Sequence, residues 1–195
     1  MTLRQQLLQI VYPLFRKFSS LSSNVNKIIT NEKNIIPKNS FYNLQSTLSN
    51  GDSFSFENLK GYKILIVNTA SNCGYTAQYE ELETLHQQYQ NKFKIIAFPA
   101  NDFKEQEKAT DEAIAQFCKI NYGISFLLMK KTKVVGNNPN EVFEWLSNEQ
   151  LNGWCNQQPV WNFCKYLINE EGKLTHFFGP AVAPLSSSII NEIQH

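Results

Sequence analysis

The sequence predicts an α/β domain with a mixed central sheet that helices cover on both faces. Three observations support this prediction. Apolar runs rich in β-branched residues alternate with segments of helical periodicity along most of the chain. Asn50-Gly51 separates two segments of alternating apolar and polar residues, which is typical of a β-hairpin. A second hairpin is predicted around Glu170-Glu171-Gly172, and its antiparallel strands make the sheet mixed.

The strands are expected where the apolar runs are shortest and most continuous. The first hairpin places its two strands on either side of the turn SNGD, within FYNLQSTL and SFSFENL. Buried central strands are expected at 64–67, 94–100 and 125–130, because these runs have almost no polar residue to face solvent. KYLIN and KLTHFF form the second hairpin.

Helices are expected between these strands. From Tyr79 to Tyr89 the apolar residues fall on one face, and three glutamates in the early turns suit the helix dipole. The segment 111–122 would turn Ile114, Phe117 and Cys118 inward. Asn140 is a plausible N-cap for a helix over 140–147, and 184–194 reads as a terminal helix. After the first hairpin the expected order is therefore β-α-β-α-β-α-β-β-α.

Length and composition exclude several classes of protein. The chain has 195 residues, 42% of them hydrophobic, which is enough for the core of one domain. Lysine and arginine total 18 against 17 acidic residues, so a nucleic-acid partner is not expected. No apolar stretch approaches the length of a membrane span, and the glycine pattern does not support a nucleotide-binding fold. The four cysteines lack C-x-x-C spacing and the three histidines lack ligand spacing, so no metal is expected.

The N-terminal segment differs from the rest of the chain. No acidic residue precedes Glu32, while apolar residues at roughly helical spacing are interspersed with Arg4, Arg16, Lys17 and Lys27. Such a basic amphipathic segment can lie on an anionic membrane surface or act as a targeting sequence. A frayed N-terminal helix explains the pattern equally well. Residues 1–39 are therefore predicted as an extension and linker, and residues 40–195 as the folded domain. A cytoplasmic location is expected, with membrane association or targeting through this segment as the alternative.

Cys73 is the residue most informative about function. It lies in VNTASNCGYTAQYEEL, just after a predicted buried strand and just before a predicted helix. Active sites of α/β proteins gather at this edge of the sheet. A thiol at a helix N-terminus is expected to have a lowered pKa. The alternative is an inert, buried cysteine. The placement resembles that of the reactive cysteine in the thioredoxin fold, but Thr76 stands where C-x-x-C would have its second thiol. A lone activated thiolate remains suited to attack on an electrophile such as a peroxide.

Three motifs make this resemblance specific. ASNCGYTAQYEELETL is similar to the first signature of the glutathione peroxidase family, within the thioredoxin superfamily, in its cysteine-containing, non-selenium form. FPANDFKEQE resembles the second signature and PVWNFCKYLI the third. The resemblance runs from about Ser40 to the C-terminus. It implies a thioredoxin-like fold that begins with a β-hairpin.

The resemblance also implies a set of site residues. Cys73 matches the peroxidatic residue, Gln106 the glutamine of the second motif, and Trp161 and Asn162 the pair in the third. Neutral donors of these kinds can hold a thiolate and a developing oxyanion without forming an ion pair. Taken singly, Trp161 could be a core residue and Gln106 a solvated one. The family usually has glycine where this chain has Lys104.

The implied activity is that of a thiol-dependent peroxidase in the response to oxidative stress. Hydrogen peroxide or organic hydroperoxides would be reduced to water or alcohols through a sulfenic acid at Cys73. No bound cofactor or metal is implied, and glutathione or thioredoxin would be the reducing co-substrate. Cys118 matches a resolving cysteine of thioredoxin-dependent members, with a buried core cysteine as the alternative. Cys155 and Cys164 are weaker candidates.

Two other functions are compatible with the same residues. One is a thioredoxin-like disulfide oxidoreductase, which Thr76 disfavours. The other is a peroxide-sensing redox relay protein, for which the basic N-terminal segment is the only support. A monomer is expected, because residues 148–158 are too few for the extra loop of the tetrameric family members.

Overall fold

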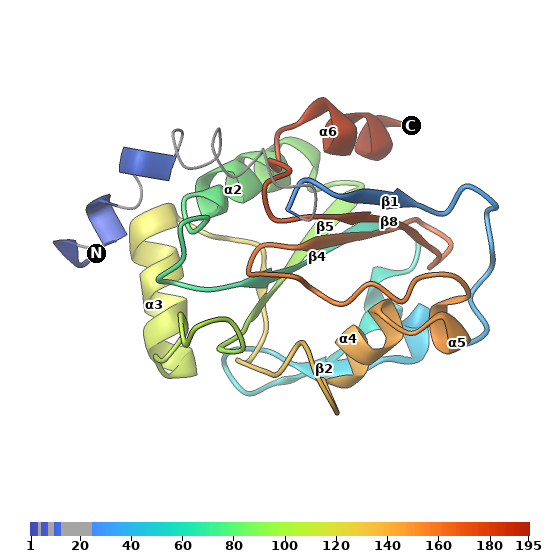
Figure 1. Cartoon of the computed structure of the whole chain (residues 1–195), viewed down its shortest axis with the longest axis horizontal. Helices are drawn as coiled ribbons and strands as arrows, with labels where there is room; N and C mark the ends of the chain where they lie inside the picture. The colour runs from blue at the N-terminus through green and yellow to red at the C-terminus, as the bar shows by residue number, and fades with distance from the viewer. Residues whose placement is uncertain (4, 8–9, 13–24) are drawn as a thin grey trace.

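A six-stranded sheet forms the centre of the computed structural model, which describes residues 1–3, 5–7, 10–12 and 25–195 (Figure 1). The strand order is β1-β8-β7-β4-β5-β6. In chain order these strands are β1 (Ile28–Thr30), β4 (Lys63–Thr69), β5 (Phe93–Pro99), β6 (Leu127–Leu128), β7 (Lys165–Ile168) and β8 (Leu174–Phe178). Strands β4, β5 and β6 are parallel, whereas β7, β8 and β1 are antiparallel to their neighbours. The predicted mixed sheet is therefore confirmed.

Helices connect the strands in the predicted order. The crossovers are α2 (Gln78–Tyr89) between β4 and β5 and α3 (Asp111–Tyr122) between β5 and β6. Two short helices, α4 (Glu141–Leu146) and α5 (Glu149–Asn152), precede β7, and α6 (Ser187–Gln194) follows β8. Neither β1 nor α5 was expected from the sequence pattern.

The two faces of the sheet carry separate apolar layers. On β4, Leu65 and Val67 pack with α2, α3 and α6, whereas Ile64 and Ile66 pack with α4 on the opposite face. The second layer also contains two 3₁₀ helices, η1 (Phe41–Asn43) and η2 (Phe56–Leu59). Because both faces are covered, every residue of β4 is buried, which explains the continuously apolar run Ile64–Val67 within it.

Helix α3 has the limits that its sequence predicts. The Thr110 hydroxyl accepts a hydrogen bond from the Ala113 backbone N–H at 3.4 Å, as an N-cap does. Gly123 ends the helix with a left-handed φ of 63°, and its N–H bonds to carbonyls of the last turn. Both signals are local, so the helix could be located from the sequence.

The first hairpin is shorter than predicted. Its strands are β2 (Gln45–Thr47) and β3 (Ser53–Ser55), and the flanking aromatic segments form η1 and η2 instead of extended strand. The hydroxyls of Ser40 and Ser55 cap these 3₁₀ turns. The strand predicted at 125–130 is likewise only two residues long, and Met129 directly after it forms an isolated bridge with Leu48 at the end of the hairpin.

Part of the predicted N-terminal extension belongs to the sheet. β1 lies before residue 40 and pairs with β8, Ile28 opposite Phe178 and Thr30 opposite His176. The predicted boundary at residues 39/40 stays a prediction, which limited proteolysis would test.

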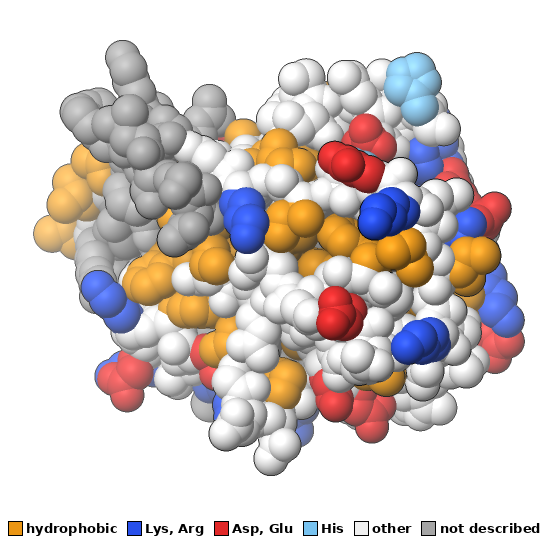
Figure 2. All heavy atoms as spheres, turned by 45° about the vertical axis from the view of Figure 1, so that its right-hand side comes forward, with side chains coloured by type: hydrophobic (Ala, Val, Ile, Leu, Met, Phe, Trp, Pro, Cys, Tyr) orange, Lys and Arg blue, Asp and Glu red, His pale blue; other side chains and the backbone are white. Residues whose placement is uncertain are grey.

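Much of the predicted amphipathic segment lies outside the described residues. Among the described ones, the side chains of Leu3, Leu7 and Ile10 are exposed, whereas Tyr12 is buried. Membrane contact stays a prediction, and binding of the full chain to anionic vesicles would test it. In the described ranges no helix is long and apolar enough to cross a membrane. On one face of the molecule, charges of both signs are scattered among apolar side chains (Figure 2).

Candidate active site

Cys73 lies in a series of tight turns between β4 and α2. Its side chain is fully buried. The Cys73 backbone N–H donates to the Thr76 hydroxyl oxygen at 3.0 Å, and that oxygen lies 2.8 Å from the carbonyl oxygens of both Ala70 and Cys73. Thr76 therefore stabilises the turn from the position at which a dithiol motif would place its second cysteine.

Four hydrogen-bond donors surround the Cys73 sulfur. The Tyr75 backbone N–H approaches it at 3.4 Å, and the Gly74 N–H is a second backbone donor. The side chains of Trp161 and Asn162 supply the other two. All of these donors are uncharged, so each can stabilise a thiolate without pairing with it as a counter-ion.

Gln106 joins the site through Asn162. Its side-chain Oε1 accepts a hydrogen bond from Asn162 Nδ2 at 2.9 Å, and its backbone oxygen accepts one from the Asn72 N–H at 3.1 Å. With Oε1 occupied, the Gln106 amide has its Nε2 group left to donate. The structure thus brings together the four residues Cys73, Gln106, Trp161 and Asn162. Their catalytic roles stay predictions.

The predicted lowering of the Cys73 pKa is wrong for this structure. Burial is the main influence and raises the pKa of the thiol, and the four donors offset only part of that effect. In addition, α2 begins at Gln78, five residues after Cys73, so the thiol does not lie in the first turn of the helix. The rate of attack on a peroxide should therefore rise with pH above neutrality, as more of the thiol ionises.

Asn68 positions the Trp161–Asn162 pair and was missed in the sequence. This fully buried residue of β4 donates from Nδ2 to the Trp161 carbonyl at 3.0 Å. Its Oδ1 accepts from the Cys164 N–H at 3.0 Å, and its backbone oxygen accepts from the Phe163 N–H at 2.6 Å. One strand therefore leads into the Cys73 turn and also fixes the segment that carries two of its donors. The one sign of this role in the sequence was the polar side chain of Asn68 directly after the apolar run Ile64–Val67.

The loop that carries Gln106 has an unusual backbone. Lys104 and Glu105 both have a φ of 51°, in the left-handed region that favours glycine. A glycine at the position of Lys104, as the resemblance implies, would adopt this conformation without strain. The Lys104 ammonium lies 5.6 Å from the centroid of the Trp161 ring, a cation–π contact that helps to hold this conformation.

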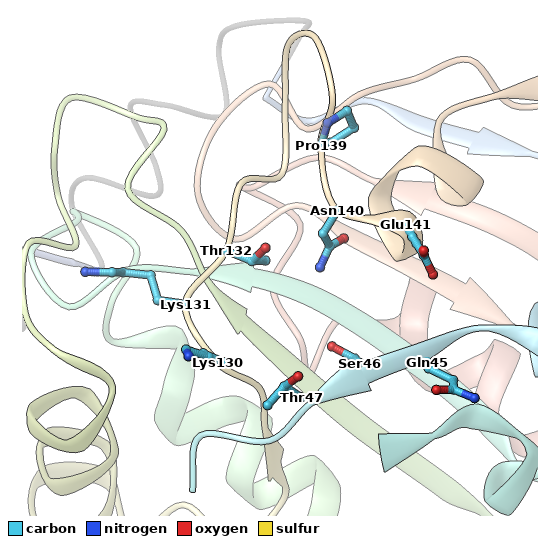
Figure 3. Close-up of a pocket in the computed structure, with 9 residues that line it drawn as sticks. All are labelled: Gln45, Ser46, Thr47, Lys130, Lys131, Thr132, Pro139, Asn140 and Glu141. Atoms are coloured by element: carbon cyan, nitrogen blue, oxygen red, sulfur yellow. The ribbon is translucent and has the colours of Figure 1, made fainter. Parts of the chain in front are cut away.

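A pocket adjoins the Cys73 turn. It has a volume of about 510 Å³ and is lined by Asn72, Lys104, Glu105, Gln106 and Lys108. A second pocket, of about 350 Å³, lies between β2 and the segment 130–141 and contains none of the predicted site residues (Figure 3). The pocket beside Gln106 thus lies next to the Cys73 turn, through Gln106 and Asn72, although the buried Cys73 sulfur does not itself line it.

Cys118 is buried in α3 and belongs to the same apolar layer as Cys73. Burial raises the pKa of its thiol to about 12, and the Tyr79 hydroxyl beside it opposes part of that rise. Its resolving role stays a prediction. Burial also raises the pKa values of Cys155 and Cys164 to about 11. All four cysteines are free thiols, and the described part of the chain holds no group of His, Cys, Asp and Glu side chains arranged to bind a metal.

Replacing Trp161 with phenylalanine should slow attack on peroxide about 10- to 100-fold at neutral pH, the worth of one hydrogen bond to a charged group. The change removes the indole N–H that stabilises the Cys73 thiolate, so the pKa of Cys73 should also rise. Rapid-mixing measurements with hydrogen peroxide and the pH dependence of iodoacetamide alkylation would check both effects.

Trp154→Phe is the matched control, because the Trp154 indole N–H donates to the Leu174 carbonyl at 2.8 Å and takes no part in the site. Equal rates of peroxide attack for the two variants would show that the Trp161 indole does not stabilise the Cys73 thiolate.

Comparisons with known proteins show which family this chain is similar to. The sequence model of the family described as "Glutathione peroxidase" matches residues 41–147. A Saccharomyces cerevisiae protein named "Glutathione peroxidase-like peroxiredoxin 2" is 44% identical over 156 residues, which cover 80% of this chain and 95% of that protein. A Schizosaccharomyces pombe protein named "Glutathione peroxidase-like peroxiredoxin gpx1" is 41% identical and covers 74% of this chain and 91% of its own length.

Solved structures extend the comparison to the fold. The structure described as "Crystal structure of T. cruzi GPX1" superposes with a TM-score of 0.60 at 27% identity, over 78% of this chain and 92% of that one. A DsbF homologue from Corynebacterium diphtheriae gives a TM-score of 0.57 at 14% identity, over 89% and 94% of the two chains. The second similarity shows the fold alone. The predicted thioredoxin-like fold is therefore confirmed.

Proposed function

This chain belongs to the glutathione peroxidase family and is a thiol-dependent peroxidase, and from this premise we propose that Cys73 is the sulfur that attacks the peroxide. The observation that carries the proposal is the convergence of the Trp161 and Asn162 side chains on the Cys73 sulfur, with Gln106 bonded to Asn162. These donors stabilise the sulfur as a thiolate and remain in place as negative charge moves to oxygen.

The oxidation step proceeds as a displacement at oxygen. The Cys73 thiolate attacks one oxygen of the hydroperoxide, so an S–O bond forms while the O–O bond breaks. The other oxygen leaves as an alkoxide or hydroxide, takes up the proton that the thiol lost, and departs as alcohol or water. Cys73 remains as a sulfenic acid. The reaction requires no bound metal or organic cofactor, only a thiol co-substrate to restore the cysteine.

Thioredoxin is the proposed reductant, acting on a disulfide between Cys73 and Cys118. Cys118 shares the apolar layer of Cys73, and both relatives described above carry the name peroxiredoxin. The pocket beside Gln106 also gives little support for glutathione. Lys108 is paired with Glu105 at 2.6 Å, and Lys104 lies over the Trp161 ring. A glutathione carboxylate would therefore have to displace an existing contact to bind either lysine.

Peroxide consumption by the full chain, measured side by side with thioredoxin and with glutathione, tests the proposed reductant. Thioredoxin with its reductase should support turnover about 10-fold or more faster than millimolar glutathione, because a preformed disulfide is its natural target. A faster reaction with glutathione would overturn the choice of reductant and leave Cys73 as the nucleophile. Absence of a dimedone adduct on Cys73 after peroxide treatment of Cys118→Ser, in which no Cys73–Cys118 disulfide can form, would overturn the nucleophile itself.

A further inference from the structure

The Trp161 indole is a donor of the active site whose orientation is not fixed by burial. Asn68 holds the backbone of Trp161 through its carbonyl at 3.0 Å, but the ring is only partly buried where it packs against the apolar layer that contains Cys73. Rotation about the side-chain torsions would turn the indole N–H away from the Cys73 sulfur. The other contacts of the ring therefore decide whether it donates to that sulfur.

Two consecutive residues of the loop that carries Gln106 contact the Trp161 ring. The ring centroids of Phe103 and Trp161 lie 5.6 Å apart, with the two ring planes tilted by 44°. The Lys104 ammonium lies 5.6 Å from the same indole centroid. Within the described part of the chain this ammonium forms no hydrogen bond or ion pair, so its contact with the indole is the interaction that holds it.

The backbone places Lys104 beside the indole at a cost. Its φ of 51° is a conformation that glycine adopts freely and lysine does not. Such strain persists only where surrounding contacts over-determine the backbone. The Asp102 carboxylate accepts a hydrogen bond from the Val134 N–H at 2.9 Å on one side of Lys104. On the other side, the Glu107 carboxylate accepts two from Ser71, at 2.7 and 2.8 Å. The loop is therefore pinned on both sides of the strained residue.

We propose that Lys104 is a positioning residue for the attack on peroxide, and that its ammonium holds the Trp161 indole in the orientation that donates to Cys73 and strengthens that donor. This inference rests on the proposed function, in which Cys73 is the attacking sulfur. The ammonium is attracted by the negative face of the ring, so it restricts rotation of the side chain. It also draws electron density from the ring, which makes the indole N–H a better donor to an anion.

Lys104 acts through Trp161 and not on Cys73 directly. The groups that lower the pKa of Cys73 are hydrogen-bond donors, with the Trp161 side chain among them, and none of them is charged. The ammonium can therefore influence the sulfur by way of the ring that it contacts. A change in that contact should appear in the pKa of Cys73 and in the rate at which Cys73 is oxidised.

Other charged and titratable groups near the site are paired or neutral. Glu105 and Lys108 line the adjoining pocket together with Lys104, and they are paired with each other at 2.6 Å. Cys164 lies within electrostatic reach of Cys73, but with a pKa of about 11 its thiol is neutral near pH 7. A shift in the pKa of Cys73 on substitution of Lys104 can therefore be assigned to the lysine.

The test is a double-mutant cycle in the full chain between Lys104→Met and Trp161→Phe. Methionine keeps an unbranched side chain but removes the charge. Rapid mixing with hydrogen peroxide gives the rate of Cys73 oxidation, and iodoacetamide alkylation against pH gives the pKa of Cys73. Lys104→Met alone should slow oxidation at neutral pH about 3- to 5-fold, the worth of one cation–π contact, and should raise that pKa. In the Trp161→Phe background the same change should cause no further loss, because the indole N–H is absent.

Three further variants separate the charge from the structure. Lys104→Arg keeps a cation that stacks on aromatic rings and should retain most of the parent rate. Lys104→Gly removes the strain at this φ, so it should unfold at about the parent temperature while it loses rate as Lys104→Met does. Lys94→Met is the matched control, because the Lys94 ammonium lies 4.5 Å from the Tyr62 ring centroid, near the start of β5 and away from the site. It should change neither the rate nor the pKa.

A parent rate together with a parent pKa in Lys104→Met would overturn the proposal. An equal fold loss from Lys104→Met in the parent and in Trp161→Phe would also overturn it, because the charge would then act without the indole N–H. If Trp161→Phe matches its Trp154→Phe control, the donor role of Trp161 and this inference fail together. The dimedone adduct of Cys118→Ser tests the Cys73 nucleophile separately, so a failure of the proposed function is distinguishable from a failure of the role of Lys104.

Discussion

Cys73→Ser is expected to abolish peroxide turnover. A serine hydroxyl has almost no ionised fraction at neutral pH and forms no counterpart of the sulfenic acid, so neither half-reaction can proceed. The Trp161 and Asn162 donors would remain, but they stabilise an anion that serine does not provide. The expected loss is on the order of 10⁴-fold or more, as for removal of other enzymatic nucleophiles. The loss is measured as the rate of peroxide consumption with thioredoxin, after subtraction of the rate without enzyme.

Cys155→Ser provides the control for this substitution. Cys155 is also a buried thiol whose pKa burial raises, but it lies on the opposite face of the sheet from Cys73. It should therefore retain the parent rate, and thermal unfolding of both variants should show whether either one loses its fold. Substantial turnover by folded Cys73→Ser would exclude Cys73 as the nucleophile.

Cys118→Ser should separate oxidation from recycling. Cys73 would still consume about one equivalent of peroxide, because the donors around it are unchanged. Thioredoxin-supported cycling should then fall about 10²-fold or more, since no internal disulfide can form and a large protein thiol must reach a buried sulfur instead. In the coupled assay we expect an initial burst of peroxide loss. Oxidation of NADPH through thioredoxin reductase should then be very slow.

The same variant should respond differently to a small thiol. Millimolar dithiothreitol can enter where a protein cannot, so it should restore more of the lost turnover than thioredoxin does. Steady thioredoxin-dependent turnover of Cys118→Ser at the parent rate would show that Cys118 does not resolve the sulfenic acid. It would then be a core residue, which is the alternative consistent with its burial.

How far the fold could be predicted depends on how local each signal is. The limits of α3 follow from Thr110 and Gly123, which act within one helical turn of the ends. The β1 strand has no comparable signal, because Ile28–Thr30 is only three residues long and its partner, β8, lies far along the chain. No local pattern can reveal a pairing that tertiary contact alone establishes.

For the site as well, features with a local sequence signal could be predicted and features that depend on tertiary contacts could not. Gln106, Trp161 and Asn162 could be predicted because the motifs around them resemble a family, and the structure places them together near Cys73. The direction of the Cys73 pKa shift could not be predicted, because the sequence shows neither the burial of the thiol nor the fact that α2 begins five residues after it. Asn68 was missed for a related reason: its three partners come from a segment more than ninety residues away, and the handful of bonds it makes exists only in the folded chain.

The position of β1 has a consequence for any processing of the N-terminus. A cleavage before Val25 would leave the outer strand intact, whereas one after Thr30 would release it and leave β8 with a free row of backbone N–H and C=O groups. Such a row is a template for pairing with another polypeptide. The shorter product would therefore be prone to self-association along the β8 edge, where Phe177 pairs with Ile29 in the intact chain.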